Sequence, residues 1–136
     1  MKKTYLVLAF LITGFLLVGD AYGEDEVYYC AEIDNNGFEF DETLKKYKRS
    51  GFVAEKFEIK LDRVSKTIEL VSEDGSRTKY LCKKPFMEET ISCTKNFYHF
   101  NFNHDEGKFV SFRGYGYVGR FLNDSLHISY GKCDKF

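Results

Sequence analysis

Apolar and polar side chains alternate along most of this chain, and this two-residue rhythm constrains the fold more than any other feature of the sequence. It is most regular in residues 53–61, where Val53, Phe57, Ile59 and Leu61 share one face and charged residues occupy much of the other. Successive side chains of a β-strand point to opposite sides of a sheet, so the pattern predicts a strand with one buried and one hydrated face. Helical periodicity is nearly absent, and we expect an all-β protein.

The same rhythm predicts a first strand at 27–33 and further strands at 66–71, 77–83, 90–94, 97–103, 108–113, 115–122 and 125–131. Between the strands stand residues that tight turns require, at Asn36-Gly37, Asp74-Gly75, Asp105-Glu106-Gly107 and Asn123-Asp124. Strands spaced this closely predict an antiparallel meander. The expected fold is one small domain, either a β-barrel of lipocalin or inhibitor size or a barrel-like sandwich.

The polar segment 41–49 interrupts the alternation. Asp41 is a residue type that caps helices, so we predict either a short helical turn over one end of the barrel or a hydrated loop. Lys45, Lys46, Lys48 and Arg49 make the segment basic. Such a cluster is typical of a hydrated surface, and the alternative is recognition of an acidic partner.

The first residues have the pattern of a secretory signal peptide. Lys2 and Lys3 precede an apolar run at 6–18, and Ala21 and Gly23 are small residues placed as at a cleavage site. Cleavage after Ala21 is an alternative. A membrane anchor is the rival interpretation, but the run is shorter than the roughly 20 residues that a bilayer span needs.

We therefore predict a signal peptide over 1–23 and a mature domain over 24–136 that is secreted or periplasmic. No later segment is long and apolar enough to suggest a membrane span in the mature chain. The formal charge of the whole chain is −1, which argues against a nucleic-acid partner because such proteins carry a basic face.

All four cysteines, Cys30, Cys82, Cys93 and Cys133, lie in the predicted mature domain. An even number in an exported domain predicts two disulfides, for which three pairings exist. We favour Cys30–Cys133, which ties the first strand to the end of the chain, and Cys82–Cys93, which closes a short loop.

The predicted faces of the first and last strands place the first of these disulfides outside the core. Val27, Tyr29, Ala31 and Ile33 form the apolar face of the first strand, and Leu126, Ile128 and Tyr130 form that of the last strand. Cys30 and Cys133 have the opposite parity in their strands. We therefore expect both on one outer face, where neighbouring strands bring them within disulfide distance.

No motif indicates a catalytic, cofactor or metal site, and we expect no enzyme activity, cofactor or metal. Gly114, Gly116 and Gly119 match the glycines of a dinucleotide fingerprint, but strand residues rather than a helix follow them. His99, His104 and His127 are not spaced as zinc ligands, and His127 is predicted to lie on the surface.

Aromatic residues make up 18% of the chain and crowd its last third, on both faces of the predicted strands. One face must be the core, so the other is available as a binding surface. The candidate residues for this surface are Phe97, His99, Tyr115, Tyr117 and Phe121. The alternative is that a small barrel without tryptophan fills its core with Phe and Tyr.

The segment Val27-Tyr28-Tyr29-Cys30, the size of the domain and the expected disulfides resemble bacterial periplasmic inhibitors of C-type lysozymes. The resemblance covers a few residues around Tyr29 and Cys30 and assigns no functional residue. We predict an exported, non-enzymatic binding protein whose partner is another protein, of the inhibitor or immunity type. The alternatives are a barrel that carries a small apolar ligand and, third, a small hydrolase.

Overall fold

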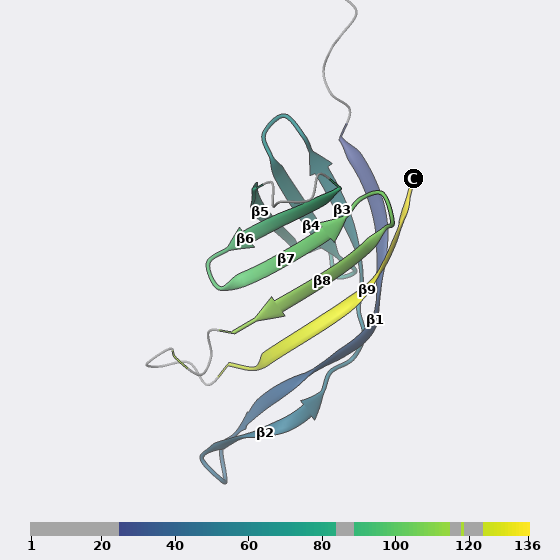
Figure 1. Cartoon of the computed structure of the whole chain (residues 1–136). Coiled ribbons are helices and arrows are strands. Elements are labelled where there is room, and N and C mark those ends of the chain that lie inside the picture. Colours follow the sequence, from purple (N-terminus) through teal and green to yellow (C-terminus); the bar gives the residue numbers. More distant parts are fainter. Residues whose placement is uncertain (1–24, 84–88, 115–117, 119–123) are drawn as a thin grey trace, which may run out of the picture.

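The computed structural model describes residues 25–83, 89–114, 118 and 124–136. Nine strands form one antiparallel sheet, and the pairing of β1 with β9 closes eight of them into a barrel (Figure 1). This confirms the predicted all-β fold. The strands are β1 (Glu26–Asp41), β2 (Lys46–Gly51), β3 (Lys56–Asp62), β4 (Thr67–Ser72), β5 (Arg77–Lys83), β6 (Thr90–Lys95), β7 (Tyr98–Asn103), β8 (Lys108–Arg113) and β9 (Leu126–Lys135).

The barrel interior is filled by side chains from alternate positions of its strands. Aromatic rings from β7 and β8 stack in its centre, where Phe100 and Phe109 lie 5.4 Å apart between ring centroids. β9 contributes small inward residues, and a Cβ atom at Gly131 would lie 2.7 Å from the ring of Phe109. The buried apolar core consists of Tyr28, Cys30, Ile59, Leu61, Ile68, Tyr80, Cys82, Cys93, Phe100, Phe102, Phe109 and Cys133.

Both favoured disulfides are present, Cys30–Cys133 between β1 and β9 and Cys82–Cys93 between β5 and β6. In each pair the two cysteines are direct partners in the strand register. Two such bonds are compatible with an oxidising, extracellular or periplasmic environment.

The prediction that Cys30 and Cys133 lie on an outer face is wrong, because both are buried inside the barrel. The two cysteines do lie on the same face of β1 and β9, as predicted, but this face points into the barrel. Tyr28 and Cys30 point inward on β1, whereas Tyr29 is 48% exposed. Large aromatic rings of β7 and β8 fill the interior next to β9. Only the smaller residues of β9 fit beside them, so the bulky Ile128 and Tyr130 lie outside.

The predicted turn at Asn36-Gly37 is also wrong, since β1 runs through both residues. Gly37 pairs with Ser50 of β2 on one side and His127 of β9 on the other. A Cβ atom at position 37 would lie 1.9 Å from the carbonyl oxygen of Leu126. The glycine therefore permits a close approach of β1 to β9 rather than a reversal of the chain.

Segment 41–49 forms a hairpin, so neither the predicted helical turn nor the predicted loop describes it fully. Asp41 ends β1, and its carboxylate accepts hydrogen bonds of 3.0 Å from the backbone N–H groups of Thr43 and Leu44. The basic residues that follow belong mainly to β2, which pairs with the second half of β1 beyond the barrel (Figure 1). In the sheet order β2 is an end strand.

The turns predicted at Asp74-Gly75 and Asp105-Glu106-Gly107 are confirmed. Gly75 and Gly107 have φ angles of 81° and 62°, which glycine adopts without strain. Strands β5 and β8 have the predicted bounds, whereas β3 begins at Lys56 and leaves Val53 exposed. In the described ranges no helix reaches the length and apolarity of a membrane span.

Candidate functional site: an outer apolar patch and the barrel mouth

Of the residues predicted to form a binding surface, the structure describes Phe97 and His99. Tyr115, Tyr117 and Phe121, and most of the strand predicted over 115–122, lie outside the described residues. Phe97 is 48% exposed in the turn before β7. His99 lies on the outer face of β7, where its ring stacks on Phe112 of β8 at 4.4 Å with an interplanar angle of 6°.

An exposed apolar patch extends from Phe112 across three neighbouring strands. Phe112 of β8 pairs directly with Ile128 of β9, and Val110 pairs with Tyr130. Phe38 of β1 pairs with Leu126, so it is a diagonal neighbour of Ile128 on the same face. We call Phe38, Val110, Phe112, Leu126, Ile128 and Tyr130 the outer patch.

The outer patch is largely exposed to solvent. Phe38 is 48%, Phe112 39%, Ile128 54% and Tyr130 50% exposed. The sequence interpretation missed Ile128 and Tyr130 as surface residues because it directed the apolar face of the last strand into the core, and it placed Phe38 next to a predicted turn. The small inward residues Ser129, Gly131 and Cys133, alternating with larger ones, were the signal that indicates the opposite orientation.

Basic side chains flank the outer patch on two sides. Lys108 and Lys132 are direct partners on β8 and β9, two positions beyond Val110 and Tyr130. Arg49 of β2 lies across from Phe38. Asp34, the β1 partner of Tyr130, is the acidic residue in the same rows. Lys108 is ion-paired with Glu106, so the excess positive charge beside the patch comes mainly from Lys132 and Arg49.

A second candidate site is a cavity of about 250 Å³ at one end of the barrel, which we call the mouth. A β-bulge between Glu32 and Asp34 shapes its rim. The bulge pushes Ile33 outward and directs both Glu32 and Asn35 inward, although they are three positions apart. Asn35 Nδ2 donates a hydrogen bond of 3.1 Å to Glu32 Oε2, which joins these two side chains.

The segment between β2 and β3 is tied to the bulge at the mouth. Glu32 Oε2 also accepts a hydrogen bond of 3.0 Å from the backbone N–H of Glu55. The backbone N–H of Phe52 donates to the carbonyl oxygen of Asn35 at 2.9 Å. The ring of Phe52 packs edge to face against His127 at 5.3 Å. The mouth is thus held by backbone and side-chain contacts together.

His127 lines the mouth, so its prediction as a surface residue is wrong. It is half-buried, and burial lowers the pKa of its imidazole below the usual value. The guanidinium of Arg113 lowers this pKa further, while the carboxylate of Glu32 raises it. The imidazole is therefore held mainly in its neutral form at neutral pH.

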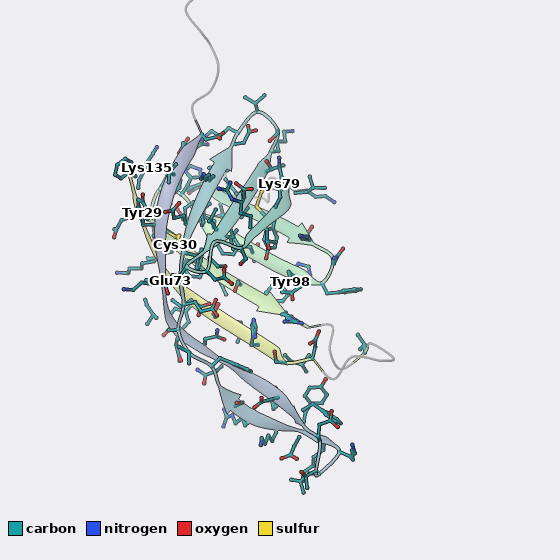
Figure 2. The ribbon with its side chains drawn as sticks, turned by 180° about the vertical axis from the view of Figure 1, so that it is seen from behind. Tyr29, Cys30, Glu73, Lys79, Tyr98 and Lys135 are labelled. Carbon is teal, nitrogen blue, oxygen red and sulfur yellow. A yellow bond between two sulfur atoms is a disulfide. The ribbon has the colours of Figure 1, made fainter. Side chains whose placement is uncertain are left out.

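The opposite wall of the mouth is aromatic and hydroxylated. Tyr80 of β5 is buried, and burial raises the pKa of its hydroxyl. Tyr98, labelled in Figure 2, lies at the start of β7, and the guanidinium of Arg113 lies 4.9 Å from its ring centroid. Ser111 and Ser129 share a hydrogen bond of 2.8 Å. These groups can bind a ligand through hydrogen bonds and aromatic faces.

A third hollow, of about 480 Å³, lies on the outer wall across β1, β3 and β4. Tyr29 and Glu73, labelled in Figure 2, belong to its lining together with Lys56 and Glu58. Glu58 is half-buried in the strand, and the hollow is open to solvent. It contains no buried polar atom without a partner among the described residues, so we give it no functional role.

Within the described ranges, no group of three His, Cys, Asp or Glu side chains is arranged to hold a metal ion. Comparison of the chain with protein-family models, with curated proteins and with solved structures finds no significant match.

Proposed function

We propose that this chain is an exported, non-enzymatic binding protein that engages another protein through the outer patch. The observation that carries the proposal is the side-by-side exposure of Phe38, Phe112, Ile128 and Tyr130 on adjacent strands. Scattered exposed apolar residues are common, but a contiguous group rimmed by polar residues is typical of an interaction surface. Burying such side chains contributes about 25 cal/mol per Å² of apolar area removed from water.

The barrel supports this role because its wall is rigid where the patch lies. β8 and β9 are joined by six residue pairs, and Cys133 fixes β9 to β1. The patch side chains therefore lose little backbone freedom when a partner binds, which lowers the entropic cost of association. An inhibitor or immunity protein works in this way, by covering a surface of its partner.

The charges around the patch favour a partner with an apolar contact surface and acidic residues at its margin. Lys132 and Arg49 border the patch, Lys108 beside them is ion-paired with Glu106, and Asp34 is the acidic partner of Tyr130. Charged residues at the margin of an interface mainly raise the association rate and make it depend on salt. The predicted signal peptide and the two disulfides support a partner outside the cytoplasm.

Site-specific photo-crosslinking in the native host tests the proposal. A photoreactive phenylalanine analogue at position 130 should give a discrete adduct with one acidic protein. Leu81 provides a matched control, since it is 69% exposed on β5, outside the patch. The analogue at position 81 should not give that adduct, and Ile128→Asp should remove the adduct formed from position 130.

Two results would overturn the proposal. One is an adduct with twice the mass of the chain together with a dimer in analytical ultracentrifugation, which would make the patch a self-association surface. The other is the same pattern of adducts from positions 130 and 81. If the partner is found, Lys132→Glu should slow association most at low salt, where rim charges act most strongly.

The sequence also suggested a carrier of a small apolar ligand. The packing of the barrel centre disfavours this alternative, because aromatic rings fill the space that an apolar ligand would need. Phe100 and Phe102 are 1% and 0% exposed, and both belong to the continuous core. The cavity at the mouth has a mixed polar lining and suggests a different ligand.

A further inference from the structure

Two buried polar atoms at the mouth, Asn35 Oδ1 and His127 Nδ1, have no hydrogen-bond partner among the described residues. Asn35 is 7% exposed. The orientation of its amide is fixed, because Nδ2 donates to the Glu32 carboxylate, which can only accept. The atom that is left without a partner is therefore an acceptor. A buried polar group in this state is unfavourable, so it indicates a site that is completed by another molecule.

His127 and Asn35 lie close enough to act on one ligand. Asn35 pairs with Ser129 and Gly37 pairs with His127, so the two side chains are diagonal neighbours on the inner face of β1 and β9. A neutral imidazole donates from one nitrogen and accepts at the other. A hydroxyl group both donates and accepts, and it therefore matches the acceptor of Asn35 and either form of His127 Nδ1.

Glu32 and Glu55 are the charged residues that line the cavity at the mouth. The carboxylate of Glu32 accepts from Asn35 and from the backbone of Glu55. The guanidinium of Arg113 forms a salt bridge with Asp124 and lies over the ring of Tyr98. The two lining carboxylates disfavour an anionic ligand, and Arg113 is already held by Asp124, so the mouth offers hydrogen bonds to an uncharged molecule.

The volume and the aromatic walls limit the ligand further. The cavity of about 250 Å³ holds far more than one water molecule, which takes up about 30 Å³ in the liquid. It is smaller than the roughly 300–1,000 Å³ typical of pockets for drug-sized ligands. Phe57, Tyr80 and Tyr98 among its lining residues offer ring faces for packing against C–H groups.

We propose that the mouth binds a small, uncharged, polyhydroxylated molecule of about one sugar ring, with hydroxyl groups on Asn35 and His127 and ring C–H groups against the aromatic wall. The site shares Phe112 with the outer patch, but Asn35 and His127 lie on the inner face and do not belong to the patch. Loss of sugar binding in His127→Phe and loss of the protein adduct in Ile128→Asp therefore test the two proposals separately.

NMR titration of the oxidised, isotope-labelled protein tests this inference. The probes are glucose, galactose, N-acetylglucosamine and myo-inositol, each added separately. At least one should cause saturable shifts of the Asn35 side-chain amide and the His127 ring signals, with a Kd of about 1 mM or lower. His127→Phe keeps a ring against Phe52 but removes the polar atom, and it should weaken binding about tenfold.

Leu81→Asp is the control, and it should leave the Kd unchanged. Decanoate serves as an apolar probe. The inference is overturned if none of the four probes shifts the Asn35 and His127 signals in a saturable way while the spectrum remains that of the folded protein. It is also overturned if decanoate binds more tightly than all four and His127→Phe leaves that binding unchanged.

Discussion

Cys30 and Cys133 are direct partners in the β1–β9 ladder, with their Cα atoms 3.9 Å apart and their disulfide inside the barrel. The bond lies at the seam where the first and last strands of the barrel meet. Because 103 positions separate the two residues along the chain, a single covalent bond restricts most of the domain in its unfolded state. The second disulfide, at a separation of 11, restricts only a local hairpin.

Removing the long-range disulfide should therefore cost more than removing the local one. On the loop-entropy relation, Cys30→Ala with Cys133→Ala lowers the free energy of unfolding by about 4–5 kcal/mol, and Cys82→Ala with Cys93→Ala by about 3 kcal/mol. Urea denaturation of the two double variants measures both values. A larger loss for the local disulfide would contradict the assignment of the seam bond as the main restraint.

Gly37→Ala should destabilise the protein by about 1–3 kcal/mol, because its Cβ would lie 1.9 Å from the Leu126 carbonyl oxygen and force β1 away from β9. Gly51→Ala is the matched control, since its Cβ would have one neighbour, Asn36 Oδ1, at 3.7 Å. Thermal unfolding should show a lower Tm for the first variant and little change for the second. Equal Tm values would argue against the close approach of the two strands.

Phe100→Ala and Phe112→Ala should separate the core from the outer patch. Phe100 is 1% exposed and packs among Phe57, Tyr80 and Phe109, so truncating it should cost about 3–5 kcal/mol. Phe112 is 39% exposed, and its truncation should cost less than about 1.5 kcal/mol. Chemical denaturation provides both values. If the order were reversed, β7 and β8 would face the opposite way.

Glu26 should make stability sensitive to acid. Hydrogen bonds from Arg63, Tyr28 and Lys135 lower the pKa of its carboxyl from 4.5 to about 2, against the opposing effect of burial. A group whose pKa is lower in the folded state stabilises the protein above its unfolded pKa, and this contribution is lost as the pH falls from 4.5 towards 2. Arg63 and Lys135 are more than half exposed, so solvent screens part of the effect.

Glu26→Gln should accordingly lower the free energy of unfolding by about 2 kcal/mol at neutral pH. The difference from the unchanged protein should shrink as the pH approaches 2. Urea denaturation across this range measures the difference directly. A difference that stayed constant with pH would show that the loss comes from packing and not from the charge.

The sequence predicted local structure well where one face of a strand was clearly apolar. Phe57, Ile59 and Leu61 alternate with lysine and glutamate, and β3 indeed directs these three inward. On β1 both faces carry apolar or aromatic residues, as at Tyr28 and Tyr29, so alternation alone does not decide which face is buried. That decision depends on the volume left by rings of distant strands, which no local pattern contains.

The mouth was beyond prediction for a related reason. Glu32 and Asn35 share a face only because a bulge adds one residue to β1, and nothing in the local sequence specifies that residue. His127 was predicted to be hydrated because its neighbours Leu126 and Ile128 look like core residues. The pairing of β9 with β1 and β8 reverses this assignment.

The end position of β2 has a consequence for how copies of this protein behave towards one another. A strand with a free side is a template onto which another chain can add, which can lead to fibrils. Lys46, Lys48 and Arg49 place three positive charges on this six-residue strand. Lys48 is ion-paired with Asp41, but Lys46 and Arg49 would still be brought together if two molecules met strand to strand here, which disfavours such pairing.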